Sequence, residues 1–123
     1  MIIHKNLKSI SLCDNIGIIT AIGNDFGYEN IFLRQVERNC ESEDVLIAIS
    51  ASGNSGNLIK AINWANEAGI TTVGLTSFDG GMMRNLVNLS IHIETENGDY
   101  GVAEDAQLAI CHMIAEALRP KNI

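Results

Sequence analysis

The sequence predicts an α/β fold in which helices cover both faces of a parallel β-sheet. Three observations support this class. Residues 45–49 form a continuous apolar run, which is typical of a strand covered on both faces. Residues 71–76 and 89–93 form two further strand-like runs, and stretches with helical periodicity lie between the three. Strands that alternate with helices in this way form parallel sheets.

The segment before the first apolar run contains one strand-like and one helix-like pattern. Residues 7–13 alternate between apolar and polar side chains, which predicts a half-buried strand. Asp14 or Asn15 follows and can cap a short helix. This helix is expected to run through Ile22 and to be stopped by Gly23.

Four later stretches have the spacing of helices. Apolar residues recur at helical intervals over residues 28–39 and again over residues 58–68. Residues 82–87 predict a short helix after a Gly-Gly pair. The final helix is predicted over residues 102–118, where Pro120 stops it.

Length and charge restrict the possible functions. The chain has 123 residues and a formal net charge of −7, which fits one domain over residues 1–123. Its eight Lys and Arg residues make no patch, so no nucleic-acid partner is expected. No apolar run approaches the ~20 residues that span a bilayer, so no membrane contact is expected. The apolar run at the start of the chain is too short for the core of a secretory signal and is soon followed by charged residues, so a cytoplasmic protein is expected.

The three cysteines give no evidence of a metal or redox site. Cys13, Cys40 and Cys111 are odd in number and far apart along the chain, so neither zinc-ligand spacing nor a redox pair is present. Buried structural thiols are the simplest interpretation. The sequence predicts no metal and no cofactor.

One strand-to-helix loop differs from the others. Residues 50–57 contain three serines, two glycines and two asparagines, and no charged residue. Ligands in parallel α/β sheets bind beyond the carboxyl ends of the strands. A helix N-terminus attracts anions through its free N–H groups, and serine hydroxyls add donors. The loop therefore predicts a phosphate site, although a plain helix cap is the alternative.

Four stretches of the sequence resemble one family in their chain order. Residues 49–55 (Ile-Ser-Ala-Ser-Gly-Asn-Ser) resemble the phosphosugar-binding loop of the SIS (sugar isomerase) domain. Residues 23–27 (Gly-Asn-Asp-Phe-Gly) are similar to a stretch of its phosphoheptose isomerase branch. Residues 75–81 and 100–107 are similar to two more. The resemblance implies the three-layer, flavodoxin-like SIS fold and a homo-oligomer, either dimer or tetramer.

The resemblance also implies a substrate and roles for particular residues. The substrate is a phosphosugar of the sedoheptulose 7-phosphate type, converted to heptose 7-phosphate by aldose–ketose isomerisation. Asp25 is expected near the sugar, and Gln107 at its reacting end. The phosphate-binding residues are expected in one loop: Ser50, Ser52, Gly53, Asn54 and Ser55.

The departures from the family concern the catalytic machinery. Family members carry a first strand, a first phosphate loop and a helix with a catalytic glutamate, and this chain begins after the position of all three. Ala115 stands where the branch has a histidine, and Ala51 where a threonine is frequent. The 123-residue chain is therefore expected to bind the phosphosugar without measurable turnover. The alternative to an isomerase is a non-catalytic sensor or scaffold module.

The final helix supplies the remaining candidates. Glu104 and Gln107 lie three residues apart in its first turns, so both can face a ligand. The alternative is that both are solvated groups in the first turn, where the helix dipole favours them. An apolar stripe is expected on the opposite side of the helix: Ala106, Ala109, Ile110, Met113, Ile114 and Ala117.

Overall fold

The computed structural model describes residues 8–119 of the chain. Three parallel strands form a sheet in the order β1-β2-β3. The strands are β1 (Val45–Ser50), β2 (Thr71–Thr76) and β3 (Leu89–His92). The helices are α1 (Ile16–Phe26), the 3-10 helix η1 (Tyr28–Asn30), α2 (Leu33–Asn39), α3 (Gly56–Glu67), α4 (Met83–Leu86) and α5 (Tyr100–Ala117). The predicted α/β class with a parallel sheet is confirmed.

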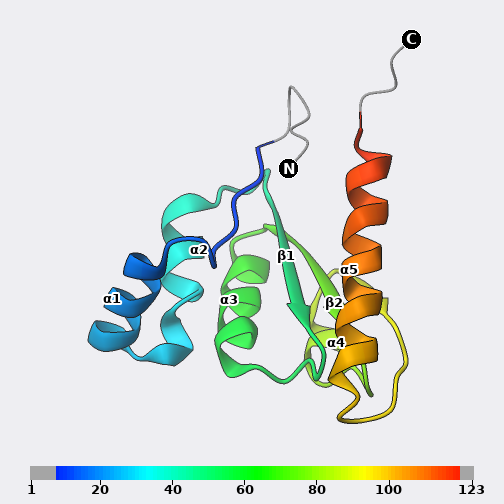
Figure 1. Cartoon of the computed structure of the whole chain (residues 1–123). Helices are drawn as coiled ribbons and strands as arrows, with labels where there is room; N and C mark the ends of the chain where they lie inside the picture. The colour runs from blue at the N-terminus through cyan, green and yellow to red at the C-terminus, as the bar shows by residue number, and fades with distance from the viewer. Residues whose placement is uncertain (1–7, 120–123) are drawn as a thin grey trace.

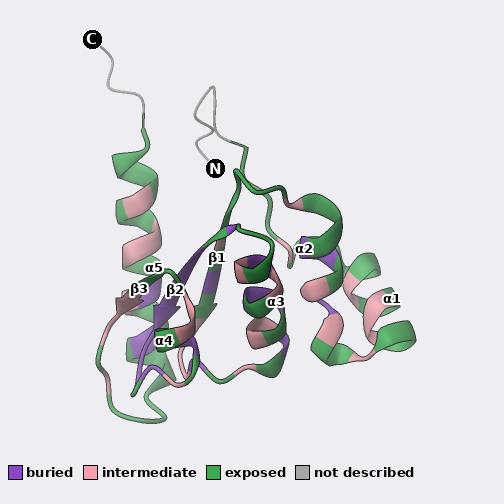
Figure 2. Cartoon of the chain, turned by 180° about the vertical axis from the view of Figure 1, so that it is seen from behind, coloured by how far each residue is buried: buried purple, intermediate pink, exposed green. Residues whose placement is uncertain are grey.

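The sheet lies between two layers of helices. Figure 1 shows α5 in front of the strands, and the opposite view in Figure 2 brings α3 and α4 to the front. α1 and α2 lie beyond α3, at the side of the sheet. All three strands point toward the edge from which the loops to α3 and α4 leave, so functional side chains are expected at that edge.

Two clusters of buried apolar side chains lie on the α3 side of the sheet. Ala48, Ile62 and Met83 join the sheet to α3 and α4. A second cluster joins α2 to α3: Val36, Ala61, Ala65 and Ile70. Apolar burial of this kind stabilises by about 25 cal/mol per Å², and in this molecule it is concentrated around α3.

The predicted strand over residues 7–13 is wrong for its described part. Residues 8–13 form no strand, and residues 12–14 turn into α1. The carbonyl oxygen of Leu12 accepts a hydrogen bond from Gln35 Nε2 (3.0 Å), and the Leu12 side chain packs on the α2–α3 cluster. This segment is therefore held by a side-chain amide instead of a neighbouring strand.

The ends of α1 show one correct and one wrong prediction. Asn15 caps the helix, and its Oδ1 accepts from the backbone N–H of Ile18 (3.1 Å). Gly23 does not end it: α1 continues to Phe26 and ends at Gly27, which has φ +90°. A left-handed backbone stops a helix readily, and Gly23 does not adopt it.

Three predictions about burial are also wrong. On β1, Val45, Ile47 and Ile49 are exposed, so this strand is not covered on both faces. On α5 the buried side chains are Ala103 and Gln107, whereas Ala109, Met113 and Ala117 are exposed. The helix therefore buries Gln107 from its predicted polar side, while Glu104 and half of the predicted apolar stripe are exposed. The buried thiols are not observed either, because Cys13 is exposed and Cys40 and Cys111 are half-buried.

Candidate functional site

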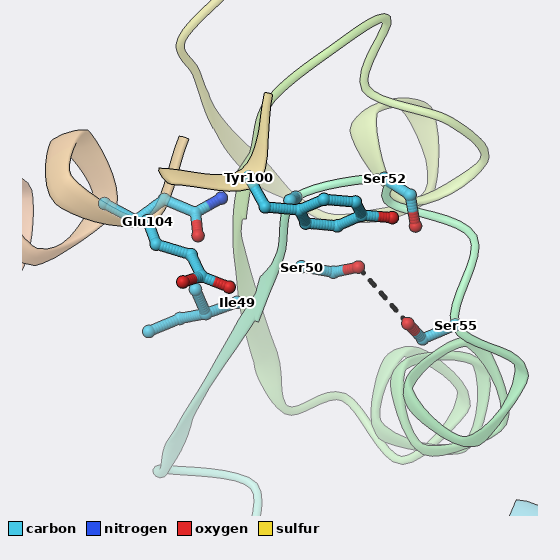
Figure 3. A pocket seen from close by; sticks show the side chains of 8 residues that line it. Ile49, Ser50, Ser52, Ser55, Tyr100 and Glu104 are labelled. Carbon is cyan, nitrogen blue, oxygen red and sulfur yellow. Dashed lines mark hydrogen bonds between the residues drawn. The ribbon is translucent and has the colours of Figure 1, made fainter. Parts of the chain in front are cut away.

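A cavity of about 410 Å³ lies at the carboxyl edge of the sheet. The end of β1 and the loop after it supply one wall, through Ile49, Ser50, Ala51, Ser52 and Ser55. The first two turns of α5 supply the other, through Tyr100, Glu104 and Gln107. Figure 3 shows these side chains around a common space. The structure thus brings together two stretches that are about fifty residues apart in sequence.

The serine hydroxyls meet at one end of the cavity. Ser50 Oγ lies 3.3 Å from Ser55 Oγ (Figure 3) and accepts a hydrogen bond from the backbone N–H of Gly53 (3.1 Å). Ser55 is the N-cap of α3, yet its side chain makes no capping hydrogen bond. Besides its contact with Ser50, its hydroxyl can therefore bind another partner, and the first N–H groups of α3 are near it. This arrangement suits an anion, because N–H and O–H groups donate to it beside a helix N-terminus.

Gly53 and Asn54 support the loop and do not line the cavity. Gly53 has φ +64°, and a Cβ there would overlap the carbonyl oxygen of Gly80. Its own carbonyl oxygen accepts from the backbone N–H of Met83 (2.9 Å), while Asn54 Oδ1 accepts from that of Met82 (3.0 Å). The loop after β1 is therefore locked against the loop after β2.

Gln107 is held from behind the cavity. It is buried, and its Nε2 donates to Ser77 Oγ (3.2 Å). Ser77 follows β2, is fully buried, and donates its backbone N–H to the carbonyl oxygen of Ala51 (2.9 Å). Ser77 thereby connects the amide of Gln107 to the serine loop, which fixes the distance between the two walls.

Glu104 brings a negative charge to the opposite end of the cavity. In Figure 3 its carboxylate lies beside Ile49, away from Ser52 and Ser55. Among the lining residues it is the one carboxylate, and no lysine, arginine or histidine is present. An anion bound here would therefore be held by neutral donors at the serine end, at a distance from this charge.

Asp25 does not join the site. It lies in the last turn of α1, is exposed, and its Oδ1 accepts from Asn24 Nδ2 (2.9 Å). In Figure 1, α1 and α5, whose first turns line the cavity, lie on opposite sides of α3. Nothing in the described range connects this carboxylate to the cavity.

Tyr100 lines the cavity although the sequence did not single it out as a site residue. The signal was present in its position, since residues 100, 104 and 107 share one side of a helix.

Within residues 8–119, no three His, Cys, Asp or Glu side chains are grouped closely enough to hold a metal ion. No helix in the same range has the length and apolar content needed to cross a membrane.

The family model that matches this sequence is the SIS domain, over residues 3–77. The chain belongs to the SIS domain family. This SIS domain is 37% identical over 118 residues to the phosphoheptose isomerase of Geotalea daltonii, covering 96% of this chain and 60% of that protein. It is 41% identical over 113 residues to the phosphoheptose isomerase of Clostridium acetobutylicum, covering 92% of this chain and 57% of that protein.

Solved structures agree with the sequence relatives. The phosphoheptose isomerase of Francisella tularensis superposes on this SIS domain with a TM-score of 0.82 and 27% identity, covering 91% of this chain and 59% of that one. The phosphoheptose isomerase of Neisseria gonorrhoeae superposes with a TM-score of 0.82 at 28% identity, covering 89% of this chain and 61% of that one. The chain therefore spans about 60% of the length of the relatives it matches.

Proposed function

We propose that this chain carries the phosphosugar-binding site of a phosphoheptose isomerase, which interconverts sedoheptulose 7-phosphate and heptose 7-phosphate. The observation that carries the proposal is the cavity between the serine loop and α5. Its serine end offers uncharged donors at a helix N-terminus, and its other end offers a carboxylate and an amide. Relatives that are 35–41% identical bear the same activity in their names.

The phosphate is assigned to Ser50, Ser52 and Ser55. Hydrogen bonds to a charged group contribute about 1.5–3 kcal/mol each, so replacing all three serines with alanine should raise the Kd for sedoheptulose 7-phosphate by at least about a hundredfold. Calorimetric titration measures this change. Ser90→Ala is the matched control, because Ser90 is an exposed serine of β3 outside the cavity. An unchanged Kd in the triple variant contradicts the assignment.

The chemistry is assigned to the other end of the cavity. Aldose–ketose isomerisation moves a proton between adjacent carbons and requires a general base. Glu104 is the one carboxylate of the cavity, so we place it at the reacting end with Gln107, which orients the sugar because an amide does not take up a proton at neutral pH. The 123-residue chain is expected to show no measurable turnover in a coupled isomerase assay, and turnover that Glu104→Gln abolishes would contradict this expectation and make Glu104 the general base.

A second candidate function is binding without turnover. It is favoured by the presence of a single carboxylate in the cavity. The same assay separates the two functions. Turnover that disappears in Glu104→Gln supports the isomerase, whereas intact binding with no turnover by the 123-residue chain supports the sensor or scaffold module.

We further infer a cytoplasmic homo-oligomer that does not bind nucleic acid. The net charge of −7 supports the last point. Exposed apolar side chains on β1 and α5, including Ile47, Leu108 and Met113, support self-association. Light scattering coupled to gel filtration measures the assembly, and a monomer at micromolar concentration contradicts it.

A further inference from the structure

Tyr100 lies between the two ends of the cavity. It is the first residue of α5, and its side chain is 54% exposed. Figure 3 shows the ring extending across Ser50, with the hydroxyl directed to the side of Ser52 and with Glu104 at the other end of the ring. The face of the ring therefore covers the space that connects the serine end to the acidic end.

Phe78 holds this ring in place. The two rings meet edge to face, with centroids 5.1 Å apart and planes at 84°, a geometry that aromatic quadrupoles favour. Phe78 is 5% exposed, so it is a fixed support, whereas Tyr100 presents its other side to the cavity.

The backbone of Phe78 is strained. Its φ is +54°, and it is the one non-glycine residue with positive φ in the described range. A bulky side chain in this region is strained and persists only where its surroundings fix it. Two contacts fix it here: Ser77, the preceding residue, connects Ala51 with Gln107, and the N–H of Phe78 lies 3.4 Å from Thr95 Oγ1. One strained turn therefore positions both Gln107 and Tyr100 against the serine loop.

We propose that Tyr100 determines specificity by packing its ring on the sugar carbons of the bound phosphosugar, with Phe78 as its positioning residue. This proposal rests on the proposed function of the cavity. A phenol ring offers an apolar face to C–H groups and carries no positive charge. The phosphate already has three hydroxyls and a helix N-terminus at the serine end. The ring is thus suited to the part of the ligand between the phosphate and Glu104.

The decisive measurement compares two ligands. Calorimetric titration of the full chain with sedoheptulose 7-phosphate and with inorganic phosphate gives two values of Kd. Tyr100→Ala should raise the Kd for the sugar phosphate about tenfold and leave that for inorganic phosphate within about twofold. Tyr100→Phe, which keeps the ring, should leave both within about threefold. Val102→Ala is the matched control, since Val102 is equally exposed (54%) on the same turn and outside the cavity.

Each other outcome has a definite meaning. If Tyr100→Ala weakens both ligands equally, or neither, the proposed specificity role is wrong. If Tyr100→Phe weakens the sugar phosphate as much as Tyr100→Ala does, the hydroxyl and not the ring is responsible, which also overturns the proposal. If the unaltered chain binds neither ligand, the proposed function fails, and this result is distinct from all of the others.

Phe78 is tested by a double-mutant cycle. Phe78→Leu should reduce the preference for the sugar phosphate over inorganic phosphate about threefold in the unaltered chain and leave it unchanged in the Tyr100→Ala variant, because its effect passes through Tyr100. A purely structural role would lower thermal stability but change that preference equally in both backgrounds, and this result excludes Phe78 as a positioning residue.

Discussion

β1 and β2 are neighbouring strands of the same length, yet they differ sharply in burial. They pair in parallel over all six residues, from Val45 with Thr71 to Ser50 with Thr76. Five of the six residues of β2 are buried, whereas only Ala48 is buried on β1. β2 has a strand on each side, while β1 is at the edge of the described sheet. Figure 2 shows the buried positions concentrated along β2 and the inner side of α3.

This difference shows what an apolar run does and does not determine. β1 is the more apolar of the two strands, since β2 contains three threonines and a glycine. Burial follows the position in the sheet and not the hydropathy of the strand. Edge strands also carry unpaired backbone groups that can accept another strand. The three predictions below test this contrast between the strands and between the loops that follow them.

The largest effect is expected from truncating one residue of a register pair. Leu75 and Ile49 are paired in the sheet, and they are 0% and 45% exposed. Leu75→Ala removes a fully buried side chain and should lower the free energy of unfolding by about 4 kcal/mol. Ile49→Ala should cost about 1 kcal/mol, because much of that side chain already contacts solvent. Urea denaturation measures both, and equal losses would show that the face of β1 is covered in solution.

A smaller effect is expected where the loops after the two strands meet. Gly53→Ala combines a left-handed backbone with an overlap on Gly80, and together these should cost about 3 kcal/mol. Gly56→Ala is the control: its added Cβ has no neighbour within 4 Å, and it lies in α3, so alanine should be neutral or stabilising by about 0.5 kcal/mol. Thermal denaturation distinguishes the two, and similar melting temperatures would contradict the close packing of the loops.

The smallest effect is expected at the start of β2. Thr72 is fully buried, and its Oγ1 donates to Asn66 Oδ1 (2.7 Å) and accepts from the N–H of Asn88 (3.0 Å). Thr72→Val keeps the shape but leaves both partners unsatisfied, at a cost of about 2 kcal/mol. Thr71→Val, at the exposed neighbouring position, should stay within about 0.5 kcal/mol. A neutral Thr72→Val in chemical denaturation would mean that water replaces the hydroxyl.

The order of strands and helices could be predicted from the sequence, because the periodicity of apolar residues and the residues that begin or end an element are local properties. The runs at 45–49 and 71–76 and the cap at Asn15 appear in the structure where they were predicted. The errors depend on partners that a local pattern does not contain. Residues 8–13 alternate between apolar and polar side chains as a strand does, but they pair with no neighbouring strand. The burial of β1 depends on which elements pack against it and not on its own sequence. Gly23 shows that a glycine ends a helix only where the backbone turns left-handed, as Gly27 does.

The site was predictable to a similar degree. The role of three serines in a loop between a strand and a helix follows from residue types and from the general placement of ligands in parallel sheets. Their meeting with Glu104 and Gln107 depends on how α5 lies across the sheet, which only the resemblance suggested. The role of Phe78 had no signal in the sequence, because its positive φ occurs at a residue type that rarely adopts it. Whether Asp25 acts on the sugar stays a prediction.

The attachment of α5 has a consequence for how the molecule moves. Its buried residues, Ala103 and Gln107, are both in the first half of the helix, and beyond Gln107 no described residue of α5 is buried. Backbone amides around Ala103 and Gln107 should therefore exchange with solvent more slowly than those of the last two turns, which exchange by fraying. Because only the first half of α5 lines the cavity, the outer end of the helix can unwind and re-form without disturbing the cavity wall.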